Sequence, residues 1–457
     1  ELTMYTNKKN YDEIVREKYD FGTGISTVVT DNIKMILNEH GEYVPTFLEP
    51  FSTFDSEKIE KLAYTCSSLS PRNEYDVAKS LFSSQNDIKF DERIGFYNAL
   101  YAGYVIEGHY RKNGSSGGFA TWILKELLEQ KYVDYVINVK ATQHPEKLFS
   151  YSISKSVEDI IKGSKTKYYP VELSEVLKIV KEVPGKYAII GLPSFIMELR
   201  LLSEIDETIK ERITFMIGLV CGHQKSSKFA DILAWQCGIK PGELKSIDFR
   251  KKIENQPSSS YGIEVTGTID GEEVRIVKEM KELYGGDWGK GLFKIRASDF
   301  TDDVMNETAD ITLGDAWLPE YTMDSEGNNI VIIRNPIIKR IVEKALTEGR
   351  IKLDEISVSK IIESQAAHYR HTQEELPYRL RKKEKRNEWI PKKRVDIREP
   401  IPFIRKRIQD VRENICLKAP IHYDEAVKRN NLDYFMKKMS LYDNAYRVLY
   451  KIQRLLK

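Results

Sequence analysis

Short apolar segments alternate with segments of helical periodicity between residues 95 and 349, and this alternation constrains the fold more than any other feature. The segments YVDYVINV, KYAIIGL and ITFMIGLVC read as strands, whereas GFATWILKELLEQ and FADILAWQCG place apolar residues at helical spacing. Strands that alternate with helices predict a mixed, largely parallel sheet flanked by helices. We therefore expect the α/β class.

Two further segments are expected to form β-hairpins. Residues 32–47 alternate apolar and polar side chains around a turn that ends at Gly41. Residues 261–278 do the same around Asp270–Gly271, a pair typical of two-residue hairpin turns. Beyond residue 370 the pattern becomes basic and mostly helical.

Charge is unevenly distributed along the 457 residues. The net charge is +2, yet the segment from Arg370 to the end has 24 Lys and Arg against 12 Asp and Glu, so the remainder carries −10. This asymmetry predicts a basic extension that lies on the acidic body, on a protein partner or on an anionic membrane surface. Acidic residues interleaved with the basic ones argue against nucleic acid.

Targeting and cysteine signals indicate a cytoplasmic protein. No apolar run approaches the length of a membrane span, and the opening ELTMYTNKK has no apolar stretch of the kind found in secretory signals. The four cysteines, at positions 66, 221, 237 and 416, are widely dispersed. Their spacing matches neither a zinc ribbon nor a disulfide framework, so we expect free thiols.

The segment YRKNGSSGGFATWIL contains the clearest candidate ligand site. Gly114, Gly117 and Gly118 would let the backbone approach a ligand, and the following helix would direct its free amide groups at phosphate. Ser115 and Ser116 would add hydroxyl donors. The same residues also fit an ordinary helix cap. A third interpretation takes Ser116 as a hydrolase nucleophile in a G-x-S-x-G turn, which would require a histidine and an acid further along the chain.

Several motifs follow one another in a fixed order across residues 20–370. They are the GSSGG turn with its helix and VDYVINV, the Gly-Ser-basic-Tyr element in GSKTKYYPVELSEVL, the strand and turn of KYAIIGLPSFIMELR, and the Gly-Asp-Ala-Trp signature in NETADITLGDAWLPEY. Together these motifs resemble the coenzyme F420 hydrogenase/dehydrogenase beta-subunit family.

The resemblance implies a flavin, FAD with FMN as the alternative. It assigns residues 114–118 (Gly114, Ser115, Ser116, Gly117, Gly118) to a phosphate-binding turn and makes Ser164 and Lys165 further contacts. Asp315 and Trp317 would lie near the flavin. No catalytic residue is assigned.

Iron–sulfur clusters, which the family holds through cysteine thiolates, are not expected here. Hydroxyl groups are too hard to replace soft thiolates, and only Cys66 and Cys221 remain at family ligand positions. We therefore predict neither a cluster nor another metal. The other ligand positions are Asp20, Thr23, Ser26, Thr30, Ser194, Ser298 and Thr301.

The resemblance also implies the organisation and the activity. We expect a ferredoxin-like remnant at residues 1–75, a flavin-binding α/β domain at 76–365 and a basic helical extension at 366–457. The implied activity is a flavin-dependent oxidoreductase that takes hydride from a reduced nicotinamide or deazaflavin. Its small-molecule substrate would be a sugar or nucleotide-sugar of surface polysaccharide biosynthesis. The alternative is a non-catalytic binding or scaffold subunit of a glycan-biosynthesis complex.

Overall fold

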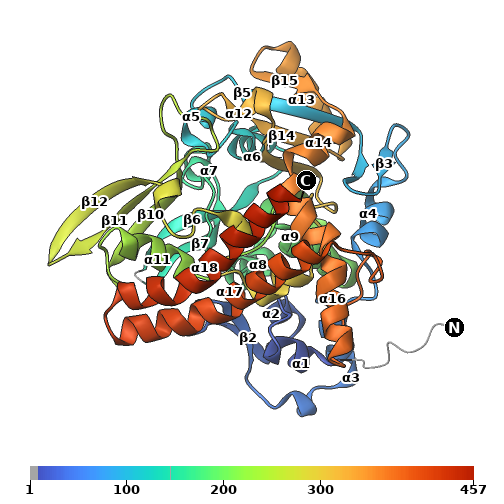
Figure 1. Cartoon of the computed structure of the whole chain (residues 1–457). Helices are drawn as coiled ribbons and strands as arrows, with labels where there is room; N and C mark the ends of the chain where they lie inside the picture. The colour runs from blue at the N-terminus through green and yellow to red at the C-terminus, as the bar shows by residue number, and fades with distance from the viewer. Residues whose placement is uncertain (1–8, 145, 457) are drawn as a thin grey trace.

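An eight-stranded mixed sheet forms the centre of the computed structural model, which describes residues 9–144 and 146–456 (Figure 1). Five strands (β5, β13, β9, β8 and β6) run in one direction and the other three run against them, which confirms the mixed, largely parallel α/β class. The order across the sheet is β15 (Ile351–Glu355), β5 (Ala99–Val105), β14 (Asn329–Ile333), β13 (Ile311–Asp315), β9 (Ile213–Leu219), β8 (Tyr187–Gly191), β6 (Tyr135–His144) and β7 (Lys147–Ser154).

Helices cover both faces of this sheet. Neighbouring strand residues alternate between two apolar clusters, as the period of a strand requires: Val136 and Ile217 belong to one, Ile137 and Met216 to the other. Because both faces are buried, the central strands are apolar almost throughout. The first cluster includes α6 (Phe119–Glu129) and α13 (Pro336–Thr347), and the second includes α8 (Ser174–Glu182), α9 (Pro193–Ile205) and α10 (Glu207–Arg212).

Both predicted hairpins are present. The first pairs β1 (Ile33–Leu37) with β2 (Tyr43–Phe47). The second pairs β11 (Gly262–Ile269) with β12 (Glu272–Glu279), and β10 (Leu244–Lys251) completes a separate three-stranded sheet that reaches away from the central one (Figure 1). Asp270 and Gly271 have φ values of +51° and +85°, the left-handed conformation that such a two-residue turn requires.

The remaining elements are mostly short. The N-terminal segment contains α1 (Tyr11–Arg16), α2 (Ser26–Val29), α3 (Ser56–Thr65), α4 (Glu74–Phe82), β3 (Lys89–Asp91) and β4 (Gly95–Tyr97). Around the sheet lie α5 (Tyr110–Asn113), α7 (Val157–Ile161), α11 (Lys228–Gln236), α12 (Pro319–Thr322), α14 (Val358–Ser364) and α15 (Ala366–Tyr369).

The C-terminal extension is helical, as predicted. It contains α16 (Leu376–Lys385) and a long helical hairpin, α17 (Phe403–Lys428) and α18 (Leu432–Leu455), whose two helices lie side by side in Figure 1. The hairpin shares an apolar core with α11 and the three-stranded sheet. Across the described residues, no helix combines the length and apolar character needed to span a bilayer.

Candidate functional site at the carboxyl edge of the sheet

The predicted site segments lie near the carboxyl ends of the central parallel strands, which form what is here called the carboxyl edge of the sheet. Asp315, at the carboxyl end of β13, pairs with Asn329 on β14, which in turn pairs with Gly103 near the carboxyl end of β5. The GSSGG turn (residues 114–118) connects α5 to α6 just beyond β5. Ligands of α/β sheets bind at the carboxyl ends of parallel strands, so this edge is the expected place for a site.

Close packing against the protein's own backbone explains two glycines of the turn. A Cβ atom on Gly117 would lie 2.6 Å from the Gly103 carbonyl oxygen and 2.9 Å from the Asn329 nitrogen. One on Gly118, where φ is +88°, would lie 2.6 Å from the Arg111 nitrogen. The glycines therefore seat the turn on β5, β14 and α5, whereas the sequence pattern suggested that they make room for a ligand.

The two serines connect this turn to other predicted segments. The Ser115 hydroxyl accepts a hydrogen bond from the Thr166 amide at 2.8 Å. Ser164 approaches α6, its hydroxyl lying 3.3 Å from that of Thr121. The GSSGG turn and the Gly-Ser-basic-Tyr element are thus neighbours.

The hydrolase interpretation of Ser116 finds no support in its contacts. The side chain is buried, and its hydroxyl donates to the Asn328 carbonyl oxygen at 2.6 Å. A nucleophilic serine instead has its hydroxyl exposed and within reach of a general base. The residue holds the turn against the segment before β14.

Three basic side chains converge beside the turn. Lys165, at a φ of +74°, pairs with Asp248 of β10. Lys167 donates to the Ser164 carbonyl oxygen at 2.8 Å, and burial lowers its pKa to about 7. Lys252 donates to the carbonyl oxygens of Arg111 and Ser116 at 2.6 and 3.2 Å, and burial lowers its pKa to about 8.

Asp315 and Trp317 meet a buried arginine that the sequence interpretation did not single out. Arg250 binds Asp315 through two nitrogen–oxygen contacts of 3.0 and 3.2 Å. Its guanidinium lies 4.3 Å from the centroid of the Tyr261 ring and 5.4 Å from that of Trp317. Arg250 and Lys252 belong to the basic run FRKK, and that run was the only local signal for either residue.

Four of the predicted cluster-ligand positions meet around a cavity of about 10 Å³, which is the size of one water molecule. A buried carboxylate from α9, Glu198, reaches the same cavity. Its oxygens accept hydrogen bonds from Thr23 and, at 2.8 Å, from the Ser67 hydroxyl. Burial, together with the Asp20 carboxyl, raises the pKa of Glu198 to about 7. The four positions are Asp20, Thr23, Ser26 and Cys66.

Four further predicted ligand positions form hydrogen bonds with neighbouring residues. Gln224 donates its side-chain amide to the Ser194 hydroxyl at 2.8 Å and its backbone amide to the Ser298 hydroxyl at 3.0 Å. Thr30 and Thr301 bond locally, to Asn32 and to the Asp303 amide. Within residues 9–144 and 146–456, no group of three or more His, Cys, Asp or Glu side chains is arranged to hold a metal ion.

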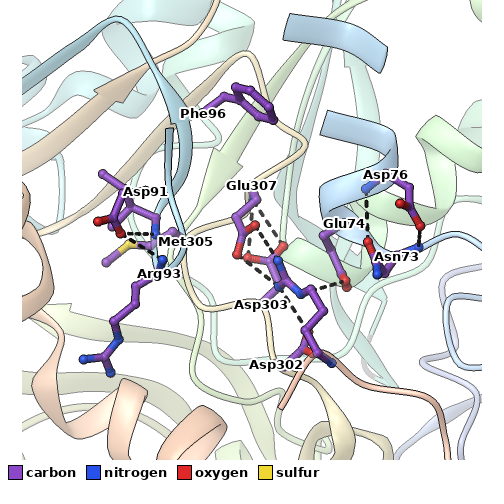
Figure 2. Close-up of polar contacts among 12 residues, drawn as sticks. Asn73, Glu74, Asp76, Asp91, Arg93, Phe96, Asp302, Asp303, Met305 and Glu307 are labelled. Carbon is purple, nitrogen blue, oxygen red and sulfur yellow. Dashed lines mark hydrogen bonds and ion pairs between the residues drawn. The ribbon is translucent and has the colours of Figure 1, made fainter. Parts of the chain in front are cut away.

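Buried carboxylates follow the predicted ligand positions Ser298 and Thr301 along the chain. Figure 2 shows Glu74, Asp302, Asp303 and Glu307 close together, all of them buried. Arg394 of the C-terminal extension neutralises part of this charge, with contacts of 2.6 and 3.0 Å to Glu307 and 3.2 Å to Asp302. The expected contact between the basic extension and the acidic body is present at this point.

The fold and the residues at this edge define an α/β protein whose candidate ligand site lies at the carboxyl ends of its strands. The chain belongs to the coenzyme F420 hydrogenase/dehydrogenase beta-subunit family, whose N-terminal model matches residues 100–178 and whose C-terminal model matches residues 185–359. The family assignment from sequence is therefore confirmed. The extension from residue 366 lies beyond both matches.

Among solved structures, the chain is similar to a chain in the xenon-derivatised F420-reducing NiFe hydrogenase complex of Methanosarcina barkeri. The two are 16% identical with a TM-score of 0.49, over 68% of this chain and 99% of that chain. Comparison with curated proteins gave no significant match.

The side chains beside the GSSGG turn fit the flavin that the family resemblance implies. The amines of Lys167 and Lys252 donate to backbone carbonyl oxygens. Among the described residues, no carboxylate oxygen lies within 4.0 Å of the Lys167 amine, and the nearest one to the Lys252 amine is a Glu326 oxygen at 4.0 Å. Amines at a glycine-rich turn before a helix are suitable donors to a diphosphate.

Proposed function

We propose that this chain is a flavin-dependent oxidoreductase that binds FAD, or alternatively FMN, at the GSSGG turn. Membership in a hydrogenase/dehydrogenase subunit family supports a redox role in general terms. The flavin proposal rests on the pair of amines, Lys167 and Lys252, beside this turn. Among the described residues, Lys167 has no carboxylate oxygen within 4.0 Å, and the one near Lys252, from the half-exposed Glu326, is 4.0 Å away. A negatively charged diphosphate would complete their environment.

When bound, the flavin supplies the redox chemistry, and the protein binds and orients it. Lys167, Lys252 and the hydroxyls of Ser115 and Ser164 would bind the phosphate end. The Arg250–Asp315 pair and Trp317 lie along the same edge and would border the reactive part of the site. We propose an organic substrate, a sugar or nucleotide-sugar, and a reduced nicotinamide or deazaflavin as donor.

Replacing Lys252 by glutamine tests the flavin site. Loss of a charge-assisted hydrogen bond costs about 1.5–3 kcal/mol, so Lys252→Gln should weaken FAD binding roughly 10- to 100-fold. Flavin fluorescence quenching during titration of the purified chain gives the dissociation constant. The adjacent Lys251→Gln is a matched control, because Lys251 pairs with Glu264 at 2.9 Å on the three-stranded sheet, and it should leave the affinity unchanged.

The spectrum of the unmodified protein decides between the two proposed classes. Flavin bands without broad iron–sulfur absorbance are expected after purification with added FAD. A chain that binds no flavin under these conditions would contradict the oxidoreductase proposal and favour the binding or scaffold subunit. Anaerobic mixing of the flavin-loaded chain with reduced nicotinamide or deazaflavin, followed by loss of flavin absorbance, identifies the donor.

A further inference from the structure

Arg412, in the middle of α17, is a buried cation that has no counterion among the described residues. The residue is 3% exposed, and the one hydrogen bond that it makes to a described residue runs from Nη1 to the neutral Gln409 amide oxygen at 3.5 Å. Its Nε is buried and unbonded. In the part of the chain that the structure describes, no carboxylate oxygen lies within 4.0 Å of this guanidinium. Arginine does not lose its proton in proteins, so the charge persists.

Two more basic side chains lie just beyond the carboxyl end of β9. Lys225 is 3% exposed, donates to the Leu292 carbonyl oxygen at 2.7 Å and lies 4.3 Å from the centroid of the Trp288 ring. His223 stacks on the same ring at 4.6 Å, and its Nε2 is buried without a partner. Neither side chain has an acidic partner among the described residues.

These three side chains are here called the cationic cluster. Lys225 pairs with Lys294 in an isolated β-bridge, and the thiol of Cys416, one helical turn after Arg412, donates to the Lys294 carbonyl oxygen at 3.1 Å. Besides burial, Lys225 and Arg412 lower the pKa of His223, and Lys294 and Arg412 lower that of Lys225. Of the carboxylates around the cluster, Asp299 pairs with Lys294, Glu375 with Arg405 and Asp315 with Arg250, whereas Asp287, which also acts on Lys225, is half exposed and lies 4.0 Å from Lys290. An uncompensated buried charge is costly, which indicates that an anion is needed here.

The cationic cluster is linked to the proposed flavin site through aromatic contacts. Trp288 lies 4.5 Å from the Tyr168 ring, and the Tyr168 hydroxyl accepts a hydrogen bond of 3.2 Å from Arg250. Arg250 holds Asp315. Lys225 also borders a cavity of about 30 Å³, whose other charged lining residues are Lys18, Asp20, Glu42 and Arg296.

We propose that His223, Lys225 and Arg412 bind a compact oxyanion carried by the substrate, a phosphate or a carboxylate group. That the anion belongs to a substrate rests on the oxidoreductase activity proposed above, whereas the anion site itself does not. Arg412 lies beyond residues 100–178 and 185–359, so the extension contributes to this site a residue that the family models do not cover. The guanidinium would bind two oxygens of the anion, with Lys225 and His223 as further donors.

Calorimetric titration of the full-length chain with inorganic phosphate tests this site, with chloride used to hold ionic strength constant. Arg412→Gln should weaken phosphate binding at least about tenfold, the effect of losing hydrogen bonds to a charged group. The control is Arg407→Gln on the same helix, where Arg407 pairs with Asp410 at 3.1 Å and is exposed, and it should bind phosphate as the unmodified chain does.

Phosphate affinities of the unmodified chain and of two variants decide the outcome. Unchanged phosphate affinity in Arg412→Gln, or no phosphate binding by the unmodified chain, overturns the proposal. Loss of phosphate binding in Lys252→Gln but not in Arg412→Gln also overturns it, because the anion then occupies the GSSGG turn. If circular dichroism shows Arg412→Gln unfolded, Lys225→Gln takes its place with the same expected weakening.

Flavin content separates this proposal from the proposed function. Absorbance at the flavin bands should be the same in Arg412→Gln as in the unmodified chain. If the unmodified chain binds no flavin but still binds phosphate through Arg412, the anion site is supported and the oxidoreductase proposal is not. Succinate titrated in place of phosphate distinguishes the sources: tighter binding of succinate indicates a carboxylate substrate, and tighter binding of phosphate a phosphorylated one.

Discussion

Glu198 occupies the place where the family resemblance puts a metal cluster. It comes from α9 and receives hydrogen bonds from Thr23 of the N-terminal segment and from both the amide and the hydroxyl of Ser67, at 3.0 and 2.8 Å. A carboxylate here cross-links segments of the chain that a cluster would otherwise join. Whether iron is absent from the protein stays a prediction, which the absorption spectrum tests.

The raised pKa of Glu198 makes stability depend on pH. Because the pKa is about 7 in the folded chain against 4.5 ordinarily, the folded state binds more protons between these values, and stability falls as pH rises from 4.5 to 7. Glu198→Gln should remove this loss. Urea unfolding at pH 5 and at pH 8 gives the free energy of unfolding of both proteins. The difference between the variant and the unmodified chain should shift in favour of the variant by on the order of 3 kcal/mol from pH 5 to pH 8.

Glu204→Gln is the control on the same helix. Glu204 is partly exposed and pairs with Arg72, so its contribution is reduced by solvent screening. A free-energy difference between Glu198→Gln and the unmodified chain that does not change from pH 5 to pH 8 would show that Glu198 is already ionised when folded.

The loop at residues 302–307 depends on a residue far along the chain. Arg394 contacts Asp302 and Glu307, and the Asp303 carboxyl has its pKa raised well above the ordinary value by burial and by Glu307. Glu74, at the start of α4, adds a fourth carboxylate. The arginine therefore fastens the C-terminal extension to the segment that leads into β13.

Arg394→Met should lower the free energy of unfolding by about 3–5 kcal/mol, because it leaves buried carboxylates without their cation. Chemical denaturation at pH 7 measures the change. Arg398→Met is the matched control: Arg398 is 67% exposed and pairs with Glu384 at 2.8 Å, and an exposed pair contributes less than about 1 kcal/mol. Equal effects of the two substitutions would mean that the carboxylates around Glu307 are protonated and need no cation.

The molecule is built around cores to which distant parts of the chain contribute. Phe435 and Tyr423 of the α17–α18 hairpin pack with Phe293 and Phe249 in one apolar cluster. The division of the chain at residues 75 and 365 stays a prediction.

Because the hairpin shares this core, we expect calorimetry of the full-length chain to show a single cooperative transition. Truncation after residue 402 should expose the apolar side chains of the shared core and lead to aggregation. Two separated transitions, with the truncated chain soluble and matching one of them, would show instead that the extension folds on its own.

Much of the architecture could be predicted because its signals are local. The periods of two and 3.6 residues identified the strands and helices, and Asp270–Gly271 predicted the hairpin turn. The family resemblance assigned residues 114–118, Ser164, Lys165, Asp315 and Trp317 to a flavin site, and that assignment stays a prediction. The structure does bring the GSSGG turn close to residues 164–166 and to the strand pair that ends at Asp315.

The site's charges and partners were decided by tertiary contacts. Hydrogen bonds join residues that are far apart in the sequence: Lys252 and Ser116 are separated by 136 positions, Glu198 and Ser67 by 131, and Arg250 and Asp315 by 65. No local pattern encodes such pairs, because they depend on which faces of the packed elements come together. The sequence by itself thus determined the family, the strand and helix pattern and the candidate segments, whereas only the folded chain decided which cations are paired and which, such as Arg412, lack a counterion.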